Sequence, residues 1–258
     1  MKTLSMAPGF AFDRFKQVTT RFLIINKKSY SLAFGGVIIG LYALWLFLVT
    51  FTGGSGYEST KFIFAASVMI YHFGGPFLTS AIFSDLQSKN SASQMLTLPA
   101  TSTEKLCSAW TVSYLMFTLA SFLAILLILA LTAVSADILL GDMSAGTVDV
   151  QVHDFITFAM TYLVYNSIFL LGSVYFRGKN FLKTVLAIVL FVFGFGVIAI
   201  AILNMTGVGS SQLSLSPPLF FFSNNPFLVL LSHLLTYVPI AALFLFFSYR
   251  SLKNREVV

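Results

Sequence analysis

The chain has 258 residues, 57% of them hydrophobic and 9% charged, with a mean hydropathy of +0.90 and a formal net charge of +6. Soluble domains carry about 25% charged residues, and a soluble chain this apolar would leave apolar surface that only association covers. The composition therefore excludes an ordinary soluble domain and indicates a membrane protein, in which 29 phenylalanines suit lipid-facing helices.

Other classes are disfavoured by residues that the chain lacks. The single cysteine, Cys107, excludes an internal disulfide framework and argues against a cysteine-based metal site, which needs several ligands. Residues 1–30 hold six basic residues but no apolar run followed by a small-residue cleavage site, so we expect no cleavable signal peptide. We find no basic stripe with interleaved aromatic residues, and therefore expect no nucleic-acid partner.

The N-terminal segment 10–28 combines aromatic and basic residues. A helix here would be amphipathic, and we expect it to lie in the inner membrane interface with its basic side chains near anionic head groups. The residues that would define this interfacial helix are Phe12, Arg14, Phe15, Arg21 and Phe22. The alternative is an ordinary basic tail that only sets the topology.

Six apolar stretches reach the length of about 20 residues that a membrane-spanning helix needs. They are Ser31–Phe51, Phe62–Phe83, Leu106–Ala136, Phe155–Phe176, Thr184–Leu203 and Phe227–Tyr249. Barrel strands alternate apolar and polar residues over about ten positions, whereas these runs are continuous and longer. We therefore predict an all-α, polytopic membrane protein with six transmembrane helices, kinked or locally unwound at Gly74-Gly75-Pro76 and tolerant of Pro239.

The basic residues predict the orientation of these helices. With the N-terminus inside, the inner segments hold 14 of the 15 lysines and arginines, and only Lys61 falls outside. This division predicts that both termini are cytoplasmic. We expect one transmembrane domain over 1–258, with a cytoplasmic interfacial segment (1–30), a six-helix bundle (31–249) and a cytoplasmic tail (250–258). The short connection Arg177–Asn180 predicts a tight hairpin between the fourth and fifth helices.

The inner segment Ser84–Lys105 connects the second and third helices and is long enough to carry function. Residues 93–98 could form a short helical turn with Met95, Leu96 and Leu98 as its apolar side chains, ended by Pro99. Thr101 and Glu104 fit a capping box, in which each side chain pairs with the other residue's backbone N–H at the start of the third helix.

Two motifs in these inner segments carry a family resemblance. Leu98-Pro-Ala-Thr-Ser-Thr-Glu-Lys-Leu resembles the loop between the second and third helices of ABC-2 type transporter permeases, which often reads Leu-Pro-(Val/Ala)-Ser-x-x-Glu. Asn26-Lys-Lys-Ser-Tyr, before the first helix, looks like small permeases of this kind from Bacteroidetes. Thr101 stands near the position where serine is common in the family.

The resemblance implies a transmembrane permease subunit of an ABC exporter in the bacterial inner membrane. Such a subunit works as a homodimer or a heterodimer and is driven by separate cytoplasmic ATPase subunits. The ATPase stroke would reach the interfacial helix and a coupling loop comprising Met95, Leu96, Leu98, Pro99, Thr101, Glu104 and Lys105. The family also has an outer re-entrant hairpin, and Ser216–Pro226 would be a short version of it. The chain holds no phosphate-binding loop of its own, so ATP hydrolysis would reside in the partner.

Polar residues inside the predicted spans are the remaining candidates, because ionisable groups in a membrane are functional by default. His72 and His233 lack a neighbouring metal ligand at helical spacing and are best interpreted as neutral histidines hydrogen-bonded between helices, while Asn166 is expected to join helices. Gly36-Val-Ile-Ile-Gly40 would allow close helix approach. We expect no cofactor, no metal and no catalytic residue.

Three alternatives remain open at this point. A scaffold or assembly protein would share the permease layout without pumping. An ion-coupled secondary carrier is disfavoured because all nine acidic residues fall in loops or at helix ends. An enzyme is disfavoured because no polar residue in the spans has a matching catalytic partner. The cargo of a transporter cannot be read from these residues.

Overall fold

The computed structural model describes residues 10–51, 55–83, 99–176, 178–206 and 226–256, without the side chains of 202–206, 226–229 and 256. The described part is helical and contains no strand. Its elements are α1 (Phe12–Phe51), α2 (Gly56–Ile82), α4 (Ser102–Trp110), the π-helix η2 (Thr111–Met116), α5 (Phe117–Leu140), the 3-10 turn η3 (Met143–Gly146), α6 (Val152–Tyr175), α7 (Asn180–Thr206) and α8 (Pro226–Glu256).

Six helices in the described residues are long and apolar enough to cross a membrane, as predicted; the third of them is the continuous run α4–η2–α5 over Ser102–Leu140. Each extends beyond its predicted apolar run at one end or both, and α2, α4 and α6 begin at polar capping residues outside that run. Ser55 caps α2 by accepting a hydrogen bond from the Glu58 N–H, so this helix starts six residues earlier than predicted. Hydropathy alone therefore does not predict the residues at which these helices begin.

The first and last helices correct the predicted boundaries. The segment expected to be a separate interfacial helix belongs to α1, which runs unbroken for 40 residues, about 60 Å at 1.5 Å per residue. Residues 250–256, predicted to be a tail, continue α8. For Gly74-Gly75-Pro76 the sequence predicted a kink or local unwinding, and the unwinding is wrong, since α2 is continuous through Pro76.

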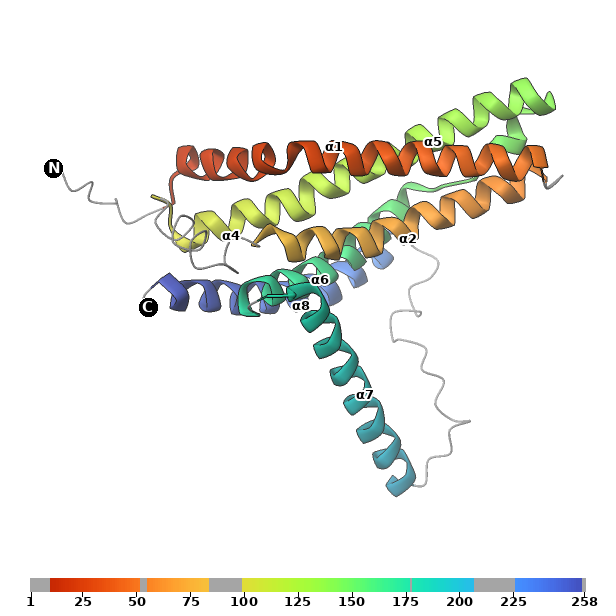
Figure 1. Cartoon of the computed structure of the whole chain (residues 1–258). Coiled ribbons are helices and arrows are strands. Elements are labelled where there is room, and N and C mark those ends of the chain that lie inside the picture. The colour runs from red at the N-terminus through yellow and green to blue at the C-terminus, as the bar shows by residue number, and fades with distance from the viewer. Residues whose placement is uncertain (1–9, 52–54, 84–98, 177, 207–225, 257–258) are drawn as a thin grey trace.

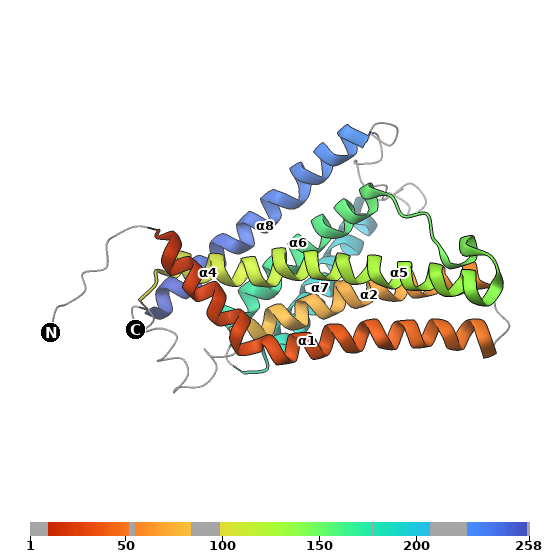
Figure 2. The same cartoon turned by 90° about the horizontal axis from the view of Figure 1, so that it is seen from above.

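The bundle has a packed core at each end. One core contains Val18 and Phe22 of α1 together with Phe83 and Leu252, so the start of α1 and the end of α8 lie at the same end of the bundle (Figures 1 and 2). The other core surrounds Trp45, whose Nε1–H donates to Thr60 Oγ1 at 2.9 Å. In a chain with an even number of spans, the first span begins and the last span ends on the same side of the membrane, and this arrangement agrees with that requirement.

Charge distinguishes the two ends of the bundle. The end that holds the start of α1, which we call the basic end, carries the described basic residues Arg14, Lys16, Arg21, Lys27, Lys28, Lys105, Lys179, Lys183, Arg250, Lys253 and Arg255. The opposite end carries Glu58, Lys61, Asp137, Asp142, Asp149 and Asp154. Arg255 ties α8 to α6 at the basic end by donating to the Tyr175 carbonyl at 2.9 Å.

Helix α7 departs from the rest of the bundle. The predicted short turn is present, but α7 leaves at a wide angle in Figure 1 instead of forming a tight hairpin along α6. The two helices meet near the turn, where Gly172 leaves room for the Thr184 side chain and Phe169 stacks on Phe181. Beyond Thr184 most side chains of α7 up to residue 201 are exposed to the surroundings of the bundle.

Candidate functional site at the starts of α1 and α4

The site begins with the predicted cap of α4. The Thr101 Oγ1 accepts a hydrogen bond from the Glu104 N–H at 3.3 Å, and the Glu104 Oε2 accepts one from the Thr101 N–H at 2.8 Å. Both halves of the capping box are therefore formed. This reciprocal pairing satisfies two backbone donors that the first turn of a helix otherwise leaves without partners.

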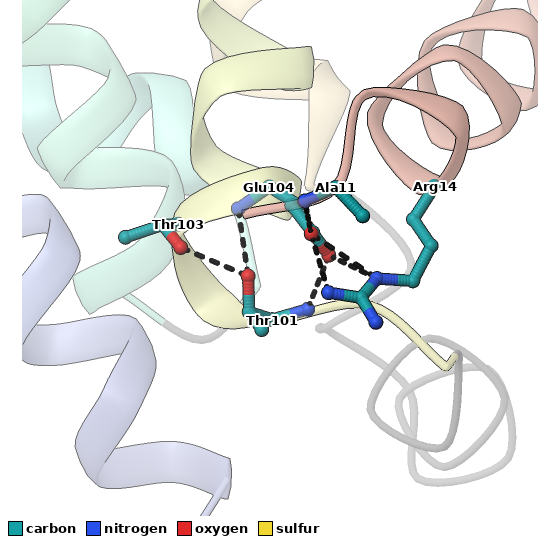
Figure 3. A network of polar contacts seen from close by, with 5 residues as sticks. All are labelled: Ala11, Arg14, Thr101, Thr103 and Glu104. Carbon is teal, nitrogen blue, oxygen red and sulfur yellow. Dashed lines mark hydrogen bonds and ion pairs between the residues drawn. The ribbon is translucent and has the colours of Figure 1, made fainter. Parts of the chain in front are cut away.

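The same carboxylate also receives the start of α1 (Figure 3). The Ala11 N–H, one residue before α1, donates to Glu104 Oε1 at 2.6 Å. The Arg14 guanidinium donates through Nε at 3.1 Å to each carboxylate oxygen and through a terminal nitrogen at 2.9 Å to Oε1. One carboxylate thus receives donors from the starts of two helices that are about 90 positions apart in sequence. We call this arrangement of Ala11, Arg14, Thr101 and Glu104 the clasp.

The clasp is buried on the carboxylate side. The Glu104 side chain is 0% exposed and that of Arg14 is 22% exposed. Of the acidic side chains that the structure describes, Glu104 alone is buried. A buried charge persists only when it is paired and hydrogen-bonded, and the positive ends of two helix dipoles favour an anion at this position.

These contacts keep Glu104 ionised. Glu104 lies before the apolar run of its helix, outside the part that we expect to cross the membrane. Burial alone would raise the pKa of its carboxyl, but hydrogen bonds from Arg14, Ala11 and Thr101 outweigh burial and lower the pKa to about 2. The carboxylate is therefore charged, and the clasp is closed, throughout the physiological pH range.

An apolar core lies directly beside the clasp. Phe22 of α1 meets Phe83, at the end of α2, with ring planes at 88°, and Ala100 and Leu106 join the same core from the start of the third span. Ser108 adds a hydrogen bond from its hydroxyl to the Phe15 carbonyl at 3.2 Å. The described residues on both sides of segment 84–98 are therefore held in one core with the first turns of α1.

The predicted interfacial residues lie on two different faces of α1. Arg14 and Phe22 point into the protein, to the clasp and the core, whereas Phe12 is 69% exposed. An outward groove on the same helix is lined by Lys16, Gln17, Thr20, Arg21, Ile24 and Ile25. The segment thus has one face in the protein and one basic and aliphatic face that is accessible.

The predicted coupling loop is only partly described. Met95, Leu96 and Leu98 lie outside the described residues. Pro99 is exposed, Thr101 and Glu104 form the clasp, and Lys105 is 1% exposed within the same first turn. The pairing of Arg14 with Glu104 was not predicted from sequence. Acidic residues are rare and basic residues are common in the predicted inner segments, which suggests that an acidic residue there is paired. This pattern does not indicate which basic residue pairs with Glu104.

A second polar cluster lies inside the bundle. Asn166 of α6 donates to Thr79 Oγ1 of α2 and to Ser113 Oγ of η2, each at 2.9 Å, while the Tyr162 hydroxyl donates to the Ser113 carbonyl at 2.8 Å. Asn166 therefore joins three helical segments, as its sequence position suggested. Gly75 faces the Tyr162 ring so closely that a Cβ would overlap it.

His72 differs from its predicted role, because its hydrogen bond stays within its own helix. His72 Nδ1 is hydrogen-bonded to the Val68 carbonyl of its own helix at 2.9 Å, and its ring packs on Phe158 and Tyr165 of α6. His233 stacks on Tyr237, and its ring centroid is 6.1 Å from that of His153. Across the described residues, no group of three or more potential metal ligands comes together.

Comparison with known proteins adds no relative to this description. No family model matches the chain, and no match was found among curated proteins or solved structures.

Proposed function

We propose that the chain is the transmembrane permease subunit of an ABC-2 type exporter in the bacterial inner membrane, driven by a separate cytoplasmic ATPase and working as a dimer. The clasp carries this proposal. It joins the start of α1 to Thr101 and Glu104 at the start of α4, and both belong to the inner segments through which such a permease receives force from its ATPase.

The helices that leave the clasp suit the transmission of force. α1 continues unbroken from Phe12 into the first span, and the run from Ser102 to Leu140 continues into the third. A displacement at the clasp would therefore move two membrane helices, because rigid secondary-structure elements carry coupling between distant sites. The basic end would face the cytoplasm, in accordance with the inward bias of lysine and arginine.

Recovery of an ATPase with the protein tests the proposal. Tagged chain purified from its native membrane in mild detergent is expected to bring a soluble ATPase, measured as ATP hydrolysis that vanadate inhibits. A variant with Leu96→Asp and Leu98→Asp is expected to lose that hydrolysis while keeping its helical circular dichroism spectrum. Wild-type protein that recovers no ATP hydrolysis would contradict the proposal.

Two alternatives have distinct outcomes in the same preparation. A scaffold would hold an ATPase whose hydrolysis never responds to candidate cargo in vesicles. A secondary carrier would accumulate cargo under a proton or sodium gradient without ATP.

A further inference from the structure

The first helix is buried in the bundle near its two ends and only partly covered between them, where Phe34 meets Phe117 with ring centroids 5.9 Å apart. Val18 and Phe22 are buried in one core, and Leu41, Trp45 and Val49 are buried in the other. No residue from 23 to 40, all of which the structure describes, is buried. The GxxxG residues Gly36 and Gly40 lie in this stretch, and a Cβ added to either would meet nothing within 4 Å.

A cavity of about 310 Å³ fills the space beside this stretch, between α1, α2 and α5. It extends along α1 from Asn26 to Leu41, which is about 22 Å at 1.5 Å per residue. Its rim includes exposed residues of both α1 and α2, among them Ala33 and Phe77, so the cavity opens between these two helices. In a membrane this opening faces the acyl chains of the lipids.

The floor of the cavity offers packing surface and few hydrogen bonds. Ile125 and Ile128 of α5 are buried there. Two floor hydroxyls are already used within the protein, because Ser67 donates to the Ile63 carbonyl at 2.7 Å and the Tyr71 hydroxyl lies 3.1 Å from Thr118 Oγ1. An apolar cavity of this kind does not hold water well but accepts apolar molecules.

The end of the cavity nearest the basic end is lined by polar residues. Asn26, Ser29 and Tyr30 line it, and Lys27 and Lys28 are exposed on the same turn of α1. Neither lysine lines the cavity, but at 3.6 residues per turn Lys27 lies next to its lining face, whereas Lys28 lies on the other side of α1. A long apolar slot with a lysine at its polar end matches a molecule with an acyl chain and an anionic head. Juxtamembrane lysines attract anionic lipids by about 1 kcal/mol each.

We propose that this cavity is a binding site for one anionic glycerophospholipid of the leaflet at the basic end, with an acyl chain between α1, α2 and α5 and the phosphate near Asn26, Ser29 and Lys27. The slot is about 22 Å long and one leaflet contributes about 15 Å, half of a hydrocarbon core of about 30 Å, so the slot takes one acyl chain together with the glycerol and phosphate at its polar end. The lipid would fill the cavity between α1, α2 and α5. The site is independent of the proposed ATPase partner.

Quenching of tryptophan fluorescence by brominated phospholipids tests the site. Phe34→Trp places a reporter in the cavity wall, and Ile39→Trp, at a position that is 70% exposed on the same helix, is the matched control. The native Trp45 and Trp110 give the same background in both. The proteins are reconstituted in phosphatidylcholine vesicles that carry a minor fraction of brominated phosphatidylglycerol or brominated phosphatidylcholine.

The two reporters are expected to behave differently. Phe34→Trp should be quenched at a lower fraction of brominated phosphatidylglycerol than of brominated phosphatidylcholine, and Lys27→Gln should weaken this preference by about five-fold, whereas Lys28→Gln, on the other side of α1, should change it less. Ile39→Trp should be quenched equally by both lipids. Equal quenching of Phe34→Trp by both lipids, or unchanged preference after Lys27→Gln, would overturn the proposal.

A second measurement needs no tryptophan reporter. Native mass spectrometry of the wild-type chain after delipidation should show one retained phosphatidylglycerol, and Ala124→Phe, which fills the cavity from α5, should release it. Wild-type chain that retains no anionic lipid, that retains zwitterionic lipid equally, or that binds as before with Ala124→Phe would refute the site.

Discussion

The guanidinium of Arg14 lies 2.9 Å from the carboxylate of Glu104, and this ion pair joins the first turn of α1 to the first turn of α4. The same carboxylate accepts the N–H groups of Ala11 and Thr101. Two helix starts far apart in sequence therefore share one buried anion. Several properties of the protein depend on this shared group.

Removal of either partner of the ion pair is expected to destabilise the folded protein. Arg14→Ala leaves Glu104 buried with less compensation, and the loss of one partner of a buried pair costs about 3–5 kcal/mol. Thermal unfolding in detergent, followed by circular dichroism, measures the effect. The matched control is Lys61→Ala, which breaks the exposed pair between Lys61 and Glu58 at 3.4 Å and should change stability by less than about 1 kcal/mol. Equal effects of the two substitutions would contradict the buried clasp.

The clasp also predicts a pH dependence. The pKa of Glu104 is lowered from 4.5 to about 2, so the unfolded chain binds a proton more readily than the folded one. The stabilisation is therefore fully present above the unfolded value and is lost as the pH falls through the folded value. Wild-type stability should decline between pH 4.5 and about 2 more steeply than that of Glu104→Gln. Parallel pH profiles for the two proteins would show that Glu104 does not hold this charge.

Adjacent glycines of α2 provide a test of the intramembrane packing. A Cβ at Gly75 would overlap the Tyr162 ring, whereas one at Gly74 would meet nothing within 4 Å. We expect Gly75→Ala to destabilise the protein by about 1–3 kcal/mol, the usual effect of overpacking. Gly74→Ala, measured by the same thermal unfolding, should be neutral or slightly stabilising. A larger loss of stability for Gly74→Ala than for Gly75→Ala would mean that α2 packs against α6 through a different face.

The polar cluster around Asn166 predicts a smaller effect. Asn166→Ala removes its hydrogen bonds to Thr79 and Ser113, and interhelical hydrogen bonds in membranes contribute about 0.6 kcal/mol each on average. We expect a loss of about 1–2 kcal/mol in unfolding by a denaturing detergent. Ser167→Ala is the control, because the Ser167 hydroxyl donates to the Leu163 carbonyl of its own helix. A loss for Ser167→Ala as large as that for Asn166→Ala would show that Asn166 does not join the helices.

Much of the fold follows from sequence because its determinants are local. Runs of apolar residues predicted six spans, and the spacing of Thr101 and Glu104 predicted a cap that the structure confirms. The unbroken course of α1 through Lys27 and Lys28 was not predicted, because a change from polar to apolar residues resembles an element boundary even where the helix continues. The path of α2 through Pro76 was missed for a related reason, since neighbouring helices compensate for a proline in a bundle.

The candidate site could be predicted only in parts. Arg14 and Glu104 were each named as candidates from sequence, but their pairing depends on how α1 packs against α4, which is a long-range property. The apolar cavity could not be predicted from sequence for the same reason. It arises because α1 is buried at Phe22 and again at Leu41 but not between them, and no local pattern encodes that separation.

Photocrosslinking from the accessible face of α1 tests the central claim most directly. A photoreactive amino acid at Gln17, in the outward groove beside the clasp, is compared with one at Val152, which is 76% exposed at the opposite end of the bundle. After irradiation of native membranes, mass spectrometry identifies the captured protein. The account predicts that position 17 captures a soluble ATPase with a phosphate-binding loop and that position 152 does not. Capture of lipid alone at position 17, or of the same proteins at both positions, would contradict it.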